Sequence, residues 1–133
     1  MTPKRIQRQR TRGWRMPKGA VSVSRPSIFG NPFVGLPSMA VAAYREWLQG
    51  SLPPRLGVYP MIRLAGYWRS EWLTPQTVLG MARADLRGKD LACWCRLCDA
   101  HAAGKPRGVE CADCAPCHAD VLLELANRQV GQP

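Results

Sequence analysis

Four stretches of the chain space their apolar residues three and four positions apart, which places those residues on one face of a helix. The predicted helices cover residues 38–50, 61–73, 75–86 and 118–127. Ser38 can cap the first of them and Gly50 can end it, while Thr74 followed by Pro75 is a pair that begins helices. The last helix carries its apolar residues on a single face, so we expect it to dock on the core.

Two shorter segments have the pattern of β-strands. Residues 20–24 alternate apolar and polar side chains, which predicts a strand with one buried face. Residues 91–95 form a short apolar run after a helix, as buried strands do. Strands separated by helices pair in parallel through a right-handed crossover. The pattern therefore predicts a small single α/β domain with a short parallel sheet and about four helices.

The segments between these elements are rich in proline and glycine. Residues 51–60 have this composition and are expected to form a connection. Residues 25–33 contain two prolines and a glycine, and we expect an ordered loop there, anchored by Phe29 and Phe33.

Length and composition favour one domain that folds. The chain has 133 residues, of which 46% are apolar and 21% charged, and this balance excludes wholesale disorder. No apolar run reaches the roughly 18 residues of a membrane span, and no apolar stretch follows the basic amino end. We therefore expect neither a signal peptide nor an anchor, and a reducing cytoplasmic location.

The net charge of +10 is concentrated near the amino end. Residues 1–26 hold eight of the 19 basic residues and no acidic residue. We therefore divide the chain into a basic arm over residues 1–19 and the α/β domain over residues 20–129. Such an arm attracts polyanions by releasing counterions from their phosphates, so nucleic acid or a nucleotide is the expected partner. The predicted contact residues are Arg5, Arg8, Arg10, Arg12, Trp14 and Arg15, with Trp14 as a stacking surface. A solvated tail is the alternative.

All six cysteines lie within 25 residues of one another, between positions 93 and 117. Two Cys-x2-Cys pairs, twelve residues apart, form a spacing that lets two tight turns offer four thiolates to one tetrahedral Zn²⁺ ion. The predicted ligands are Cys95, Cys98, Cys111 and Cys114. His101 could replace Cys95, and Cys117 could replace Cys114. Between the pairs, residues 102–108 are small and polar, so a metal cross-link would have to hold them in place.

Other uses of these cysteines fit the sequence less well. Disulfide bonds are disfavoured in a reducing compartment, and the spacing does not match the usual ferredoxin runs of an iron–sulfur cluster.

Cys117 and His118 stand at the start of the last predicted helix. A helix amino terminus lowers a thiol pKa and binds anions, so Cys117 could act as a nucleophile or hold a phosphate. Together with Cys93, the two residues could instead form a second set of metal ligands. A capping residue and a buried structural thiol are the simpler alternative.

Several uncommon blocks of the sequence resemble, in order, a domain of unknown function found in phages and bacteria. The blocks are Gly13-Trp14-Arg15-Met16-Pro17, Gly30-Asn31-Pro32-Phe33, Leu86 to Cys95, and Cys117 to Leu122. The resemblance covers nearly the whole chain and implies a phage-related protein, but it brings no established activity. It also implies that residues 95–117 contain an insertion, which favours a locally built zinc knuckle. The shared blocks supply candidates for a common site: Arg15, Arg25, Asn31, Lys89, Cys93, Cys95, Cys117, His118 and Asp120.

Three classes of function fit these features. The first is a zinc-stabilised module that binds nucleic acid. The second is a small nucleotide-processing enzyme, a glycosidic-bond hydrolase or a base-modifying enzyme, with Asn31, Cys117, His118 and Asp120 as candidate catalytic residues. A zinc deaminase fits poorly because its pattern needs a glutamate beside a zinc ligand. The third is a phage factor that binds a host protein.

Overall fold

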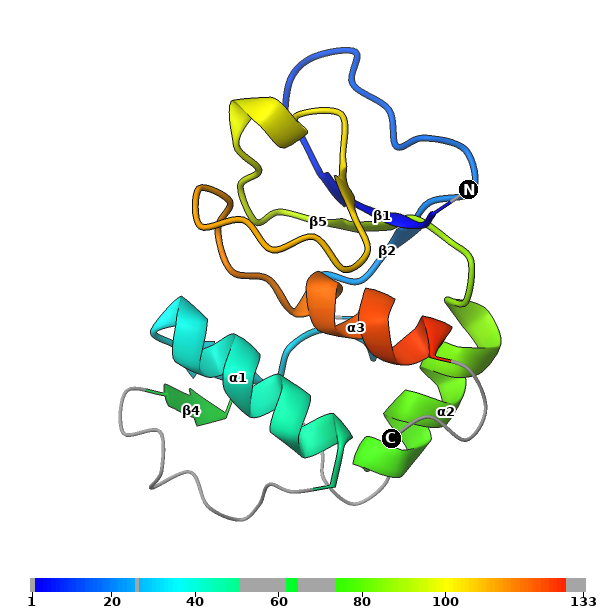
Figure 1. Cartoon of the computed structure of the whole chain (residues 1–133), viewed down its shortest axis with the longest axis vertical. Helices are drawn as coiled ribbons and strands as arrows, with labels where there is room; N and C mark the ends of the chain where they lie inside the picture. Colours follow the sequence, from blue (N-terminus) through cyan, green and yellow to red (C-terminus); the bar gives the residue numbers. More distant parts are fainter. Residues whose placement is uncertain (1, 26, 51–61, 65–73, 129–133) are drawn as a thin grey trace.

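The helices of this protein gather on one side of the molecule and a four-stranded sheet lies on the other (Figure 1). The computed structural model describes residues 2–25, 27–50, 62–64 and 74–128. Along the chain the elements are β1 (Lys4–Gln7), β2 (Val21–Ser22), β3 (Phe33–Gly35), α1 (Pro37–Leu48), β4 (Ile62–Leu64), α2 (Pro75–Asp85), β5 (Leu91–Cys93), the 3-10 turn η2 (Asp99–His101), β6 (Lys105–Pro106) and α3 (His118–Asn127). The fold is therefore a small α/β domain, with three α-helices among the described residues rather than the expected four.

The sheet has the strand order β2-β5-β1-β6. Strand β5 runs parallel to both neighbours, with Leu91 opposite Arg5 on one side and Val21 on the other. Strand β6 pairs antiparallel with β1, so the sheet is mixed and not wholly parallel as expected. All three residues of β5 are buried, which explains why this strand reads as a continuous apolar run.

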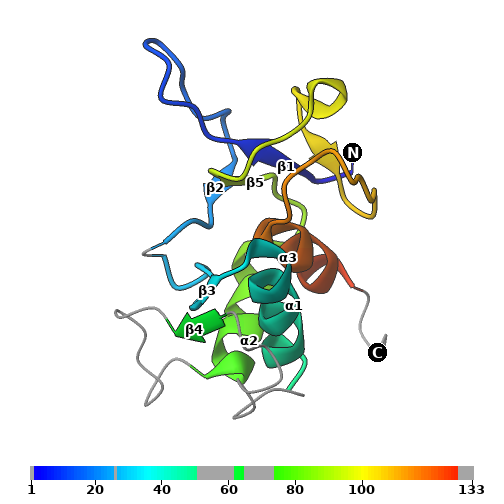
Figure 2. The same ribbon diagram turned by 90° about the vertical axis from the view of Figure 1, so that its left-hand side faces the viewer.

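Strand β1 differs most from the expectation, because it belongs to the segment assigned to a basic arm over residues 1–19. It lies inside the sheet between β5 and β6, and both Arg5 and Ile6 are buried. The backbone amide of Lys4 also donates to the Asp90 carboxylate over 3.0 Å. The projecting basic segment is therefore the loop from Arg8 to Ala20, which extends away from the sheet in Figure 2.

The helix ends follow local chemistry. Helix α1 has Leu36 rather than Ser38 at its N-cap position. Helix α2 is capped as predicted, by the side-chain oxygen of Thr74. Helix α3 is capped by the Cys117 thiol, which accepts a hydrogen bond from the Ala119 amide.

A helix was expected over residues 61–73, but the described part of this range forms a strand. Ile62–Leu64 is strand β4, which pairs antiparallel with β3 so that Phe33 stands opposite Leu64. The other apolar positions that indicated a helix, Tyr67, Trp68 and Leu73, lie outside the described residues.

Helix α3 is the centre of the core. It contacts β1, β5, α1 and α2, and seven of its ten residues are buried, so the predicted docking helix is confirmed. The loop before β3 is anchored by buried Phe29 and Phe33, as predicted. The Tyr44 hydroxyl holds the same loop by donating to the Phe29 carbonyl over 2.9 Å. Among the described residues, no helix combines the length and apolar character needed to cross a membrane.

Candidate metal centres

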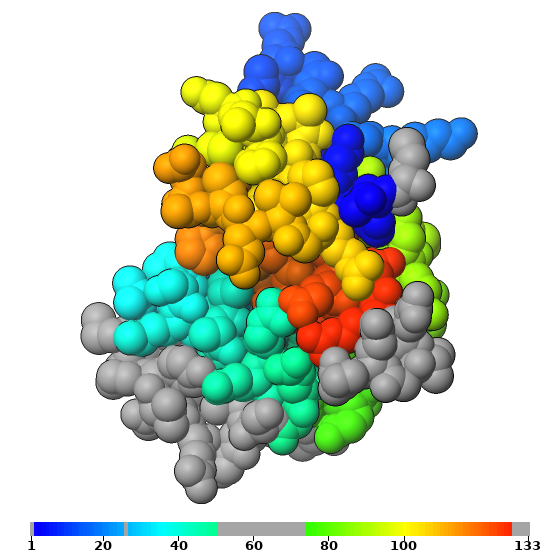
Figure 3. Space-filling model, viewed as in Figure 1, coloured from blue at the N-terminus to red at the C-terminus, as the bar shows by residue number. Residues whose placement is uncertain are grey.

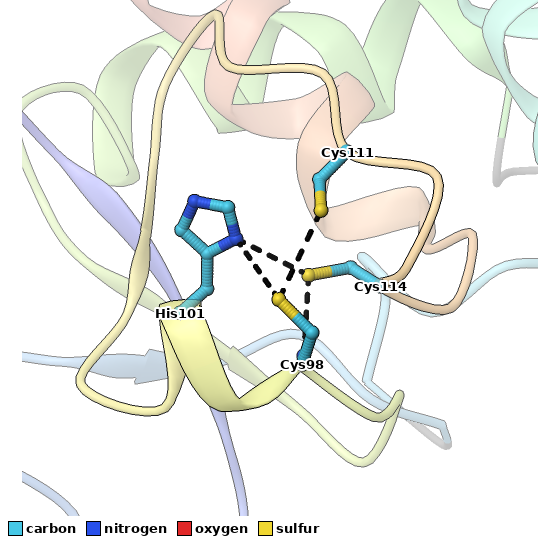
Figure 4. A group of neighbouring side chains, drawn as sticks. All are labelled: Cys98, His101, Cys111 and Cys114. Carbon is cyan, nitrogen blue, oxygen red and sulfur yellow. Dashed lines mark hydrogen bonds between the residues drawn. The ribbon is translucent and has the colours of Figure 1, made fainter.

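Four potential ligands converge in the segment between β5 and α3 (Figure 4). The ligand atoms of Cys98, His101, Cys111 and Cys114 all lie within 4.8 Å of one another. The Cys98 and Cys111 sulfurs are 3.8 Å apart, and His101 Nδ1 lies 3.3 Å from Cys98 Sγ and 3.6 Å from Cys114 Sγ. Zinc–sulfur bonds of about 2.3 Å in a tetrahedron place two sulfurs about 3.8 Å apart, and sulfur and nitrogen about 3.6 Å apart. These four residues, here called the knuckle site, could therefore hold a metal ion.

Local backbone geometry brings the knuckle ligands together. The single turn η2 carries His101 back onto Cys98, where the His101 amide donates to the Cys98 carbonyl over 3.0 Å. From the other segment, Cys114 Sγ accepts from the Cys98 amide over 3.3 Å. Hydrogen bonds from the amides of Asp113 and Cys114 lower the pKa of the Cys111 thiol, which favours the thiolate form that binds metals.

The polar turn after η2 is attached to the domain by more than these side chains. Strand β6 adds it to the edge of the sheet, and the Arg107 amide donates to the Pro3 carbonyl over 2.9 Å. In Figure 3 the yellow and orange segment that carries the knuckle lies between the blue amino-terminal residues and the cyan start of α1. Gly104 has φ of +131°, and an added Cβ would stand 2.5 Å from the Lys4 side chain. Glycine therefore suits this position in both conformation and space.

The structure places His101, and not Cys95, in the knuckle site. Cys95 Sγ lies 3.8 Å from Cys93 Sγ, toward the sheet. The reason is that η2 turns His101 back onto Cys98, whereas no helical turn joins Cys95 to Cys98. Cys117, the alternative to Cys114, also lies with Cys93 rather than in the knuckle.

A second group of potential ligands lies against the core. The ligand atoms of Cys93, Cys117 and His118 fall within 4.8 Å of one another, and all three residues are buried. Cys117 Sγ is 3.9 Å from His118 Nδ1. The half-buried Cys95 adjoins this group through its contact with Cys93.

Crowding of the thiols shifts their acidities in opposite directions. Hydrogen bonds with Cys93 and then Cys95, together with burial, raise the pKa of Cys117 well above its usual value. Hydrogen bonds from Cys117 and Cys95 lower the pKa of Cys93. For Cys95 the contact with Cys117 lowers the pKa, but the contact with Cys93 and burial outweigh it, and the pKa rises to about 11. The raised pKa disfavours the thiolate that a nucleophilic Cys117 would need.

Three of the four residues suggested for an enzyme site border one cavity, and the fourth does not. Cys117 and His118 line a cavity of about 200 Å³ that Asn31 also borders. The Asn31 amide is already engaged, donating to a carbonyl of α1 over 3.0 Å and accepting an amide of its own loop over 2.9 Å. Asp120 lies apart from this cavity, on a groove of about 880 Å³.

The predicted nucleic-acid contacts separate into two sets. Arg5 is only 1% exposed and donates to the Asp120 carboxylate, so its guanidinium is not available to a phosphate. Arg12 and Arg15 are exposed in the loop after β1, and Trp14 between them is half-buried.

An aromatic residue that the sequence analysis did not select stands beside this loop. The guanidinium groups of Arg8 and Arg10 lie over the Trp94 ring, 4.4 and 4.7 Å from its centroid, and Trp94 remains 39% exposed. The sequence signal for an exposed Trp94 was its position between Cys93 and Cys95. Alternate residues of an extended segment point to opposite sides, so the tryptophan faces away from the two cysteines.

Comparison with known proteins identifies a family but gives no activity. A family model described as "Domain of unknown function (DUF4326)" matches residues 6–128. Searches of curated proteins and of solved structures return no match.

Proposed function

This chain belongs to the family described as Domain of unknown function (DUF4326), and we propose that it is a small zinc-binding protein that associates with nucleic acid through its basic loop. The observation that carries the metal assignment is the tetrahedral spacing of Cys98, His101, Cys111 and Cys114. Three thiolates and one imidazole form a closed ligand set typical of structural zinc. The ion would fix the segment between β5 and α3.

The nucleic-acid part of the proposal rests on charge and on exposed aromatic surface. The loop over residues 8–20 contains basic residues and no acidic one, while Asp120 and Glu124 each pair with two cations elsewhere in the domain. Trp94 is 39% exposed, with Arg8 and Arg10 over its ring, and so offers aromatic and cationic surface to a base. Single-stranded nucleic acid suits a surface that combines exposed cations with one accessible ring.

The zinc and the nucleic-acid surface are connected through one segment. Trp94 follows β5 directly and precedes the knuckle by a few residues. A metal ion that holds this segment would also hold the Trp94 ring in place. Metal removal is therefore expected to weaken nucleic-acid binding as well as the fold.

A salt titration of binding to single-stranded DNA and RNA tests the loop. The variant Arg10→Gln/Arg12→Gln/Arg15→Gln should bind more weakly, with the slope of log K against log salt reduced by roughly one for each lost phosphate contact. The control is Arg83→Gln, which removes one exposed charge from α2, among the helices and away from the basic loop, and should leave the slope unchanged. An unchanged slope in the loop variant would identify the loop as a solvated tail.

A second pair of variants tests the ring. Trp94→Ala should weaken binding by about 1–3 kcal/mol, the amount contributed by one stacked base, whereas Trp94→Phe should retain most of the affinity. Zinc content measured on both variants separates loss of stacking from loss of the metal. Equal affinity for all three proteins would rule out a stacking role.

A further inference from the structure

A second group of sulfur and nitrogen atoms lies between the sheet and the start of α3, apart from the knuckle site. We propose that Cys93, Cys95, Cys117 and His118 bind a second Zn²⁺ ion, and we call them the inner site. Cys93, Cys117 and His118 have their ligand atoms within 4.8 Å of one another, and Cys95 Sγ is 3.8 Å from Cys93 Sγ. That distance is the sulfur–sulfur edge of a zinc tetrahedron, about 3.8 Å.

The course of the two cysteine-bearing segments explains why there are two sites. The segments lie side by side, and the Ala115 amide donates to the Arg96 carbonyl over 2.8 Å. This bond lies between Cys95 and Cys98 on one segment, and between Cys114 and Cys117 on the other. Each segment therefore sends cysteines to both sides of the bond, outward to the knuckle and inward to the core. Of the two Cys-x2-Cys pairs that indicated one site, Cys95 and Cys98 are divided between the two sites, whereas Cys111 and Cys114 both belong to the knuckle site.

The His118 ring is held as a metal-binding histidine is. Its Nε2 lies 2.7 Å from the Val23 carbonyl oxygen, and because a carbonyl can only accept, Nε2 carries the proton. In the neutral ring Nδ1 then has a free lone pair, and this atom faces Cys117 Sγ at 3.9 Å. Histidine ligands of metals commonly donate their other ring N–H to a carbonyl in this way.

The donor set and its surroundings suit zinc. Thiolates and a neutral imidazole prefer zinc to hard cations such as Mg²⁺. The Ala119 amide donates to Cys117 Sγ over 3.5 Å at the amino end of α3, a hydrogen bond that a metal-bound thiolate can also accept. A cysteine that only fills space packs against carbon. Here three sulfurs and an imidazole nitrogen also meet one another at the edge of the hydrophobic core.

Three of the four proposed ligands also line a cavity. Cys95, Cys117 and His118 line the cavity of about 200 Å³, whose wall includes the exposed Arg25. The inner site does not rest on the knuckle assignment, because it shares no ligand with it.

Zinc per chain, measured on the full-length protein purified without chelators, tests this proposal. The wild type should carry two ions, and Cys111→Ser/Cys114→Ser should lose only the knuckle ion. His118→Ala should lose only the inner one. If the wild type carries one ion and Cys111→Ser/Cys114→Ser carries none, the inner site is overturned. One ion that survives in that variant would instead support the inner site and overturn the knuckle assignment.

Cobalt substitution keeps the test decisive if an inner-site variant fails to fold. In the Cys111→Ser/Cys114→Ser background, bound Co²⁺ should show the thiolate charge-transfer absorbance of three sulfurs, and Cys95→Ser should lower it by about a third. Asp99→Ala, an exposed position in η2, is the control that should change neither metal content nor spectrum. An unchanged spectrum in Cys95→Ser would remove Cys95 from the ligand set, and absence of Co²⁺ binding in this background would overturn the site.

Discussion

The Arg5 guanidinium donates to the Asp120 carboxylate over 2.8 Å and so ties the centre of the sheet to the first turn of α3. The same guanidinium donates to the carbonyls of Ala115 and Arg96, over 2.8 and 3.1 Å, on the two segments that carry the cysteines. Lys105 of β6 reaches the other oxygen of Asp120 at 3.1 Å. A buried cation is tolerated only with such partners, because removing it from water is costly. This cluster therefore helps to position both candidate metal sites.

Replacing Arg5 with methionine should lower the free energy of unfolding by about 3 kcal/mol, because it leaves the carboxylate and two carbonyls without their buried donor. Arg45→Met is the matched control. The Arg45 pair with Glu124 is more than a third exposed, so its loss should cost less than about 1 kcal/mol. Denaturant unfolding of both variants with metal bound measures the difference. Equal losses would contradict the structural role assigned to Arg5.

His101→Ala should lose the knuckle zinc, because the fourth ligand atom disappears, whereas His101→Cys should retain it with four thiolates. Zinc analysis with competition by a chelator gives the result. Full retention of the metal by His101→Ala would show that another residue completes the site. Lower pH should release the ion from the wild type, since protons compete with zinc for the thiolates.

Asn31→Ala should lower the free energy of unfolding by about 1–3 kcal/mol, because its buried amide bridges the loop before β3 and helix α1. Asn127 is the matched control. The Asn127 amide also donates to Leu123 and accepts from Gly88, but in a more exposed place where water can replace the two hydrogen bonds. Asn127→Ala should therefore lower the free energy of unfolding by less than Asn31→Ala does. A catalytic Asn31 would instead leave stability nearly unchanged when replaced.

Glu124 should make stability depend on pH. Partial burial raises its pKa, but the hydrogen bonds from Arg128 and then Arg45 outweigh this and lower the pKa overall. Its stabilisation is therefore present above the unfolded-state pKa of about 4.3 and is lost as the pH falls through the folded-state value.

In a series of unfolding curves, Glu124→Gln should cost less than about 1 kcal/mol at pH 7. The cost should shrink toward zero under acid conditions. Glu110→Gln, the same change at an exposed position, should have little effect throughout. A cost for Glu124→Gln that does not depend on pH would argue against the ion pairs as its source.

Local signals determined much of this molecule. Apolar periodicity gave α1, α2 and α3, and a short apolar run gave β5, because each pattern reflects burial within a few neighbouring residues. Thr74 as a helix cap was also predictable, since a cap bonds to its own first turn. The crowding of six cysteines between positions 93 and 117 pointed to metal chemistry without any knowledge of the fold.

Tertiary structure alone decided the rest. The sequence predicted that residues 4–7 belong to a charged arm. Arg5 is instead a buried strand residue, because its hydrogen-bond partners lie about 90 to 115 positions away in the chain. The cysteine spacing alone predicted one site, but a ligand group depends on where two segments meet. The bond between Arg96 and Ala115 sets that meeting point, and it separates Cys95 from Cys98. The sequence supplies the thiols, but the pairing of distant segments assigns each thiol to its candidate site, because a set of metal ligands is defined by distances in space.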